Sequence, residues 1–215
     1  MAEDHVKAAY AAVLNGDLEG AREQVRLSLA GGLAADRLLK DGLIAAMGEV
    51  GRLFEAGEFY VPEMLVAARA MKGCLEILRP LLVDSDVKPV GTVVIGTVSG
   101  DLHDIGKNLV AMMLEGAGFE VHDLGVDVSP QKFVEAVQAT DPDIVAMSAL
   151  LTTTMAEMEA TVNAPRRAEV LDKARILVGG APVNAAFAEK IGADGYAPDA
   201  SQASAVARRL VAAKG

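Results

Sequence analysis

Residues 90–106 read VGTVVIGTVSGDLHDIG, an apolar and β-branched run that ends in a loop bounded by glycines. Residues 90–98 have the composition of a buried strand, and a helical pattern occupies residues 105–115. The loop between them contains Asp101 and His103. In open α/β sheets, ligands bind at loops that connect a strand to the next helix. This stretch therefore predicts an α/β domain with a ligand site at Asp101 and His103.

His103 has the side chain of a metal ligand, and Asp101 has that of a carboxylate that could orient the ligand. A neutral histidine binds a metal through one ring nitrogen and donates its other N–H to a carboxylate. Zinc needs three or four side chains, whereas the chain contains only His5, His103, His122 and Cys74. A metal at His103 would bring most of its own ligands, as a metal in a tetrapyrrole or corrin does. The alternative is that Asp101 caps the following helix and His103 is an ordinary loop residue.

Short apolar runs in the second half of the chain each precede a helical pattern. That alternation predicts a parallel sheet with helices on both faces. With the strand order 2-1-3-4-5, the winding reverses between the first and third strands, so the loops after these strands open into one crevice. No Gly-x-Gly-x-x-Gly follows the first strand, which argues against a dinucleotide site. The predicted fold is a doubly wound, flavodoxin-like domain with five parallel strands near residues 90–98, 119–123, 143–148, 174–178 and 194–197.

The first part of the chain has helical periodicity throughout residues 6–83. Glycine-containing breaks divide this region into about four helices, which is the number needed to close a small bundle. The breaks lie near residues 15–17, 31–32 and 57–58. Apolar residues spaced by three and four should form the core face of the last of these helices. They are Leu65, Ala68, Met71, Leu75, Leu78 and Leu82.

A chain of 215 residues is long enough for two small domains that each bury a core. The apolar periodicity is lost at residues 84–89, which read DSDVKP and end in proline. We therefore predict a helical cap domain over residues 1–85, a linker over residues 86–89 and an α/β domain over residues 90–215.

The composition of the chain restricts the partners and the cellular compartment that we expect for the protein. A formal charge of −10 argues against binding to nucleic acid or to an anionic membrane. The chain has no run of about 18 uncharged apolar residues and no apolar signal core at its acidic N-terminus, so we expect a cytoplasmic protein. The single cysteine, Cys74, excludes an internal disulfide and lies in an apolar helical pattern. We expect its thiol to be packed and inert.

Three motifs occur in one order: GDLHDIGKN at residues 100–108, SAL at 148–150 and GG at 179–180. They resemble the Asp-x-His-x-x-Gly, Ser-x-Leu and Gly-Gly signature of cobalamin-binding domains. Upstream, MGEVGRLF at residues 47–54 and YVPEM at 60–64 are similar to the helical cap of cobalamin-dependent methionine synthase and of corrinoid methyl-carrier proteins. The resemblance covers nearly the whole chain. It implies a cofactor that is cobalamin or a related corrinoid, methylated in one of its states.

The resemblance also implies the roles of the residues below the cobalt. His103 matches the metal ligand that replaces the cofactor's own nucleotide base, and Asp101 would accept the other imidazole N–H. Thr154, six residues after Ser148, matches the third member of the network, where methionine synthase has serine. The network of His103, Asp101 and Thr154 would couple the oxidation state of cobalt to protonation.

Further cofactor-binding residues are implied by the same motifs. Hydroxyls of Ser148 and Thr152 would line the pocket for the displaced nucleotide, unless they only cap the following helix. Gly179 and Gly180 would let the nucleotide approach the backbone, although a tight turn alone also explains them. The remaining positions in this domain are Gly100, Leu102, Asp104, Ile105, Gly106 and Leu150 from the motifs, with Tyr196 and Ala200 placed after the last strand, where they could also simply pack.

In the cap, Phe54, Val61 and Met64 fall on positions that cover the upper, methyl-bearing face in methionine synthase. An apolar lid of this kind would exclude water and protect the cobalt–carbon bond. Without the family, these residues are explained as core residues of a helical bundle.

The function implied is that of a methyl carrier, a corrinoid subunit that is not a catalyst by itself. Its partners would be a substrate-specific methyltransferase, an acceptor methyltransferase and a reductive activation protein. The donor would be methanol, a methylamine, a betaine or a methoxyaromatic compound, and the acceptor a thiol or tetrahydrofolate. The main alternative is a non-catalytic corrinoid sensor or storage module. A more remote one is a flavodoxin-like or receiver-type signalling domain.

Overall fold

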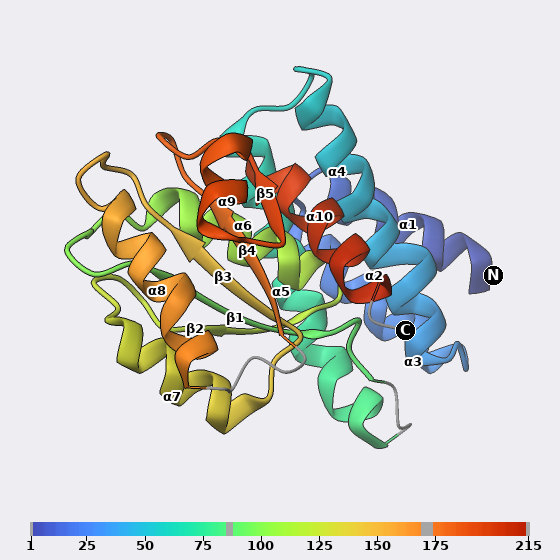
Figure 1. Cartoon of the computed structure of the whole chain (residues 1–215). Helices are drawn as coiled ribbons and strands as arrows, with labels where there is room; N and C mark the ends of the chain where they lie inside the picture. The colour runs from blue at the N-terminus through green and yellow to red at the C-terminus, as the bar shows by residue number, and fades with distance from the viewer. Residues whose placement is uncertain (1, 85–87, 169–173, 214–215) are drawn as a thin grey trace. The chain divides into compact units, whose positions relative to one another are not determined.

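The computed structural model describes residues 2–84, 88–168 and 174–213 (Figure 1). The chain forms two compact units, Met1–Lys88 with Glu115–Gly118, and Pro89–Leu114 with Phe119–Gly215. The boundaries of the cap, linker and α/β domains stay a prediction, and residues 86 and 87 of the predicted linker lie outside the described residues.

The first unit consists of helices, as predicted. Helix α1 packs on α2 and α4, and α5 packs on α2 and α4. The third helical stretch is continuous but contains a π-helical segment, η1, between α3 and α4. Counting this stretch once, the unit has the expected four helices. The bounds are α1 Ala2–Leu14, α2 Leu18–Ala30, α3 Ala35–Arg37, η1 Leu38–Ile44, α4 Ala45–Glu55 and α5 Val61–Asp84.

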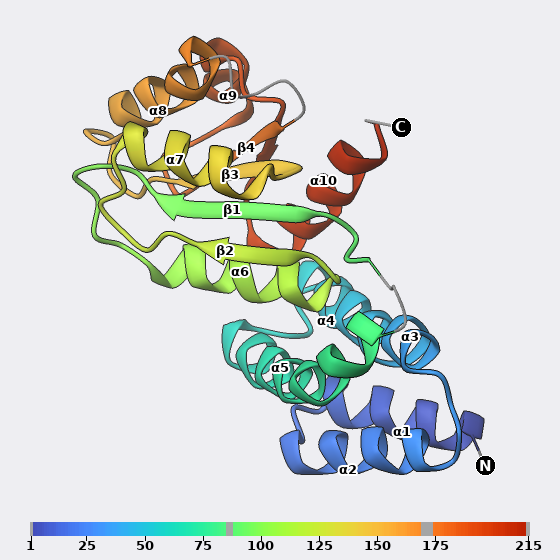
Figure 2. The ribbon, with the colours of Figure 1, turned by 90° about the horizontal axis from the view of Figure 1, so that it is seen from below.

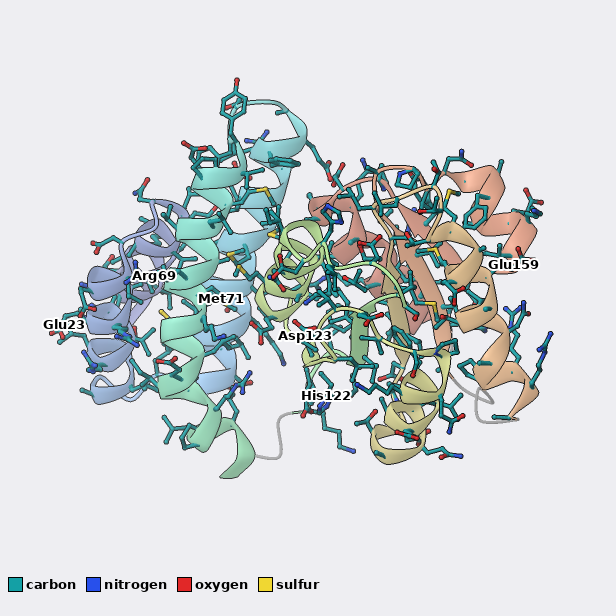
Figure 3. The ribbon with its side chains drawn as sticks, turned by 90° about the vertical axis from the view of Figure 1, so that its left-hand side faces the viewer. Glu23, Arg69, Met71, His122, Asp123 and Glu159 are labelled. Atoms are coloured by element: carbon teal, nitrogen blue, oxygen red, sulfur yellow. The ribbon has the colours of Figure 1, made fainter. Side chains whose placement is uncertain are left out.

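The core face of α5 differs in two respects from the prediction. Ala68, Met71 and Leu78 are buried as expected. Leu75 is only half-buried, and Leu65 is 40% exposed. The buried stripe begins instead at Met64, and adjacent residues of an α-helix point about 100° apart. The spacing of apolar residues was therefore right, but Leu65 was wrongly assigned to the core. Figure 3 labels Met71 on this helix.

The second unit is a five-stranded parallel sheet with the predicted order β2-β1-β3-β4-β5. Helices α7, α8 and α9 cover one face, and α6 and α10 cover the other (Figure 2). The strands are β1 Thr92–Thr97, β2 Glu120–Asp123, β3 Ile144–Ser148, β4 Arg175–Gly179 and β5 Gly195–Ala197. The helices are α6 Ile105–Gly116, α7 Pro130–Thr140, α8 Met155–Arg167, α9 Ala185–Ile191 and α10 Ala200–Ala212.

The apolar runs form strands because both faces of the sheet are buried. Val93, Val94 and Ile95 of β1 are almost inaccessible to solvent on either face. On the side of α7 and α8, Phe133 and Met158 belong to the main cluster of buried apolar residues. Since all strands are parallel, the loops after β1 and β3 leave the same edge of the sheet. This edge contains the predicted site.

Candidate functional site

Hydrogen bonds between the end of β1 and the loop that follows it hold this loop in place. The fully buried hydroxyl of Thr97 donates a hydrogen bond to the backbone carbonyl of His103 over 2.9 Å. The N–H of Asp101 donates to the carbonyl of Val98. Gly100, between them, has φ of +77°, a conformation that residues with a Cβ rarely adopt. The loop thus folds back so that His103 lies above the end of the strand.

Asp101 and His103 form the predicted pair. The Asp101 side chain is fully buried, whereas that of His103 is 53% exposed. Asp101 Oδ1 accepts a hydrogen bond from the backbone N–H of His103 and lies 3.0 Å from the ring Nδ1. Because a carboxylate only accepts hydrogen bonds, Nδ1 must be the protonated nitrogen. The lone pair of the ring is then on Nε2, where it can bind a metal.

The second oxygen of Asp101 connects this loop to the loop after β3. Asp101 Oδ2 accepts hydrogen bonds from Leu150 N–H at 2.7 Å and from the Thr154 hydroxyl at 2.8 Å. Leu151 N–H lies slightly farther away, at 3.4 Å. The structure therefore brings together His103, Asp101 and Thr154. Asp101 does not cap helix α6, since its hydrogen-bond donors all lie outside that helix, and the capping alternative is wrong.

The charge of Asp101 is maintained by these hydrogen bonds. Burial raises the pKa of Asp101, but hydrogen bonds from Leu150, His103 and Thr154 together outweigh burial. They hold the pKa well below its usual range, because each donor favours the ionised carboxylate. Asp101 is consequently an anion at neutral pH that fixes the orientation of the imidazole.

Exposed apolar side chains lie close to His103 and to the donors of Asp101 along the chain. Among the described large apolar residues, Leu102 and Ile105 are the most exposed, at 73% and 79%, and Leu150 and Leu151 in the loop after β3 are also exposed. Of the predicted residues, Asp104 directly precedes helix α6 and Gly106 is the second residue of that helix. The carbonyl of Asp104 accepts a hydrogen bond from Asn108 N–H in the first turn. The segments that contain His103 and the donors to Asp101 thus carry exposed apolar side chains.

The predicted glycine pair ends β4 beside the loop after β3. Gly180 has φ of +124°, and a Cβ at this position would lie 1.9 Å from the carbonyl oxygen of Ala149. Only glycine fits there. The N–H of Val183 donates to the carbonyl of Gly180, so this is also a tight turn. A role of Gly179 and Gly180 toward a nucleotide stays a prediction.

The structure places the remaining predicted residues of this domain in different elements. Ser148 is the last residue of β3 and Thr152 lies in the following turn, whereas Thr154 is the N-cap of α8. The alternative that Ser148 and Thr152 cap this helix is therefore wrong. Tyr196 lies within β5, not after it, and packs against the buried apolar cluster. Ala200 does follow the strand, as the buried first residue of α10. Their contacts with a cofactor stay a prediction.

The three predicted lid residues differ in exposure. Phe54 on α4 is half-buried, Val61 at the start of α5 is exposed, and Met64 is fully buried. The burial of Met64 agrees with its alternative role as a core residue of the bundle. A role in covering a cofactor stays a prediction for all three.

Sequence analysis missed several polar residues that hold the site. Lys107 on α6 is almost fully buried, and its Nζ lies 2.5 Å from Asp123 Oδ2 and 2.6 Å from Asn108 Oδ1. Figure 3 labels Asp123 at the end of β2. Lys107 lies three and seven residues before the apolar Val110 and Leu114, so its place on the inner stripe of an amphipathic helix was a usable signal. No pattern in the sequence marked Thr97 or Asp127 as part of the site.

Comparison with known proteins identifies the family. A B12 binding domain matches residues 91–205, and a second B12 binding domain matches residues 6–79. Dimethylamine corrinoid protein 1 of Methanosarcina acetivorans is 42% identical over 183 residues, which is 85% of this chain and 86% of the relative. Trimethylamine corrinoid protein 1 of the same organism is 41% identical over 211 residues, 97% and 98% of the two chains. The chain belongs to the corrinoid protein family.

Solved structures agree with this corrinoid protein in fold. A cobalamin-binding protein from Desulfitobacterium hafniense has a TM-score of 0.80 and 31% identity, with 95% of this chain and 98% of that chain covered. A chain of the methanol:cobalamin methyltransferase complex from Methanosarcina barkeri has a TM-score of 0.83 and 29% identity, with 98% and 80% covered. The predicted fold, family and corrinoid cofactor are thereby confirmed.

The residues of this corrinoid protein fit its cofactor. In the described part of the chain, no group of three or more His, Cys, Asp or Glu side chains could hold a metal ion. A corrin would bring most of the ligands of its metal, so a single protein ligand would suffice, and the Nε2 of His103 could be that ligand. Exposed apolar side chains of Leu102, Ile105 and Leu150 would suit an apolar macrocycle. Among the described helices, none is long and apolar enough to cross a membrane.

Proposed function

We propose that this corrinoid protein carries a methyl group between a substrate-specific methyltransferase and an acceptor methyltransferase. The observation that carries the proposal is the imidazole of His103, held by a buried carboxylate with its Nε2 free to bind cobalt. Relatives named for dimethylamine and for trimethylamine are equally similar, both 42% identical. They favour a methylated amine as donor over methanol, a betaine or a methoxyaromatic compound, with a thiol or tetrahydrofolate as acceptor.

The residues act on the cofactor through the imidazole. Bound cobalt supplies a centre that accepts a methyl group in one oxidation state and gives it up to the next acceptor. His103 would hold the metal through Nε2, while Asp101 keeps the proton on Nδ1. Thr154 and Leu150 N–H hold the other oxygen of Asp101, so the carboxylate cannot turn away from the ring.

Two parts of the proposal concern the surroundings of the cofactor. Phe54, Val61 and Met64 are proposed to cover the methyl group and to exclude water from it. A reductive activation protein is proposed as a third partner, since a carrier that loses its reduced state must be returned to it. In this proposal the chain is a subunit of a methyltransferase system and has no turnover alone.

The ligand assignment is tested by comparing two histidines that each follow a carboxylate by two residues. His103 follows Asp101 in the loop, and His122 follows Glu120 on β2, where its Nε2 lies 3.4 Å from the Glu120 carboxylate. After loading with hydroxocobalamin and reduction to Co(II), the wild-type protein should show axial nitrogen coupling in its electron paramagnetic resonance spectrum.

The substitution His103→Gly should abolish this coupling while the cobalamin stays bound, and His122→Gly should leave it unchanged. Coupling that persists in the His103→Gly variant would show that another group binds the cobalt. Loss of coupling in the His122→Gly variant alone would transfer the assignment to His122.

The methyl-carrier role is tested by turnover. The loaded and reduced protein should take up a methyl group when a methyltransferase is supplied with trimethylamine, dimethylamine or monomethylamine, and lose it again when an acceptor enzyme is added. Absorbance spectra follow both steps. Parallel reactions with methanol, a betaine and a methoxyaromatic compound, each with its own methyltransferase, identify the donor. Failure with every donor and enzyme would favour the corrinoid sensor or storage module instead.

A further inference from the structure

The loop between β2 and α7 contains a backbone conformation that residues other than glycine rarely adopt. Among the described residues, only two with a Cβ have positive φ, Asp127 at 51° and Asp141 at 43°. Such conformations persist where the surrounding structure holds them. Asp141 ends helix α7, and its N–H donates to the carbonyl of Val137 as an ordinary helix C-cap. Asp127 ends no helix, so its conformation has another cause.

The contacts of Asp127 all go to the loop that contains His103. Its Oδ1 accepts a hydrogen bond from Gly100 N–H at 2.7 Å and lies 3.5 Å from the Ser99 hydroxyl. Its own backbone N–H donates to the carbonyl of Asp101 over 3.0 Å. Asp127 therefore contacts three consecutive residues, and the last of them is the carboxylate partner of His103.

The left-handed backbone of Asp127 is what allows both kinds of contact. The next residue, Val128, donates its N–H to the carbonyl of Thr97 and forms a parallel bridge with Val98. This pairing places the β2–α7 loop along the start of the β1–α6 loop. A residue that turns its N–H and its carboxylate toward the same neighbouring loop can then hold the two peptide units that flank the one between Gly100 and Asp101, through the Gly100 N–H and the Asp101 carbonyl.

That peptide unit matters because Gly100 is the most freely rotating residue before Asp101. If φ and ψ of Gly100 changed, the Asp101 carboxylate would leave the donors on the loop after β3. We propose that Asp127 is a positioning residue for His103, which acts by fixing the backbone of Gly100 and Asp101. The proposal rests on the proposed function, in which His103 is the ligand of cobalt. Asp127 itself is exposed to solvent and contacts neither the ring nor the metal position.

Three substitutions of Asp127 distinguish the effect of its carboxylate from the effect of its backbone conformation. Asp127→Asn keeps an oxygen acceptor and tolerates the left-handed region. Asp127→Gly keeps the conformation without the acceptor, and Asp127→Ala loses both. Asp141→Ala is the matched control, because it strains a left-handed position in the same domain whose N–H bonds within helix α7 rather than to the loop of His103.

The first measurement is hydrogen exchange of the Gly100 amide in the protein without cofactor. Exchange should be about 10-fold faster in Asp127→Gly and Asp127→Ala than in the wild type, and nearly unchanged in Asp127→Asn and Asp141→Ala. The second measurement is the ratio of nitrogen-coupled to uncoupled Co(II) after loading with hydroxocobalamin. It should fall by about 10-fold in the same two variants, the lower end of the range for residues that support a metal ligand.

The outcomes distinguish this proposal from the proposed function. Unchanged Gly100 exchange in Asp127→Gly and Asp127→Ala would overturn the role of Asp127 alone. A coupled fraction that is normal in Asp127→Gly but low in Asp127→Ala would also overturn it, since only backbone strain would then matter. A wild-type protein without nitrogen coupling would contradict the ligand assignment of His103 itself, and with it the positioning role.

Discussion

Asp101 and Cys74 are both fully buried, yet their surroundings shift their pKa values in opposite directions. Cys74 lies on α5 in a helical core, where burial raises its pKa to about 12. Asp101 lies in the loop after β1, where hydrogen bonds from two loops outweigh burial and lower its pKa. The difference shows that burial alone keeps a group neutral and inert, whereas converging N–H and O–H donors keep a buried group charged.

The largest expected effect is slow alkylation of the Cys74 thiol in the folded protein. Its pKa is raised from 9.0 to about 12, so about 1,000-fold less thiolate is present at a given pH below 9. Alkylation by iodoacetamide at pH 8 should therefore be at least about 1,000-fold slower in the folded protein than in urea. Because the chain has a single cysteine, mass spectrometry of the intact protein gives both rates. Similar rates with and without urea would show that the core around α5 opens readily.

The second prediction compares aspartates at the two edges of the sheet. Asp143 accepts a hydrogen bond from Thr92 N–H at the amino end of β1, over 2.9 Å. The substitution Asp101→Ala leaves the donors of Leu150 and Thr154 without their acceptor. It should lower the free energy of unfolding by about 3 kcal/mol, and Asp143→Ala by about 1 kcal/mol. Urea unfolding measures both. An equal loss would mean that Asp101 is no more than a structural aspartate.

The third prediction is that the lowered pKa of Asp101 makes the free energy of unfolding depend on pH in acid. A lowered pKa in the folded state means that the carboxylate stabilises the fold above its unfolded pKa of about 3.9, and that this contribution is lost as the pH falls below that value. Asp101→Asn removes the titrating group. The free energy of unfolding of the wild type should fall more steeply below pH 4 than that of Asp101→Asn. Parallel curves for the two proteins would contradict the lowered pKa.

The smallest effect concerns two buried threonines. The Thr97 hydroxyl donates to the carbonyl of His103, whereas that of Thr161 donates to Glu157 within helix α8. Thr97→Val and Thr161→Val should each cost about 1 kcal/mol of stability. Only Thr97→Val should also change the nitrogen coupling of cobalamin-loaded Co(II), because only Thr97 contacts the backbone of the ligand. A change in both variants would indicate a general loosening of the domain.

The strands of the α/β domain were predictable to within two residues at either end. The β-branched run of β1 is buried, and a loop that contains Gly100 follows it, so composition alone indicates where that strand ends. Helix α5 was predictable in extent but not in the rotation of its core face. Leu65 and Met64 are both apolar neighbours, and only the helices packed against α5 determine which of them is buried.

The sequence by itself determined that one histidine preceded by an aspartate follows the first strand, and that too few other ligands exist for a metal without its own macrocycle. Spacing within a motif is local, so it can be read directly from the chain. The family resemblance already implied that Thr154 joins His103 and Asp101, but the Leu150 N–H donor and the contacts of Asp127 were found only in the tertiary structure. Leu150 lies about 50 residues from Asp101 along the chain, and Asp127 lies on a third loop. These contacts depend on how parallel strands bring their loops to one edge, which no spacing along the chain specifies.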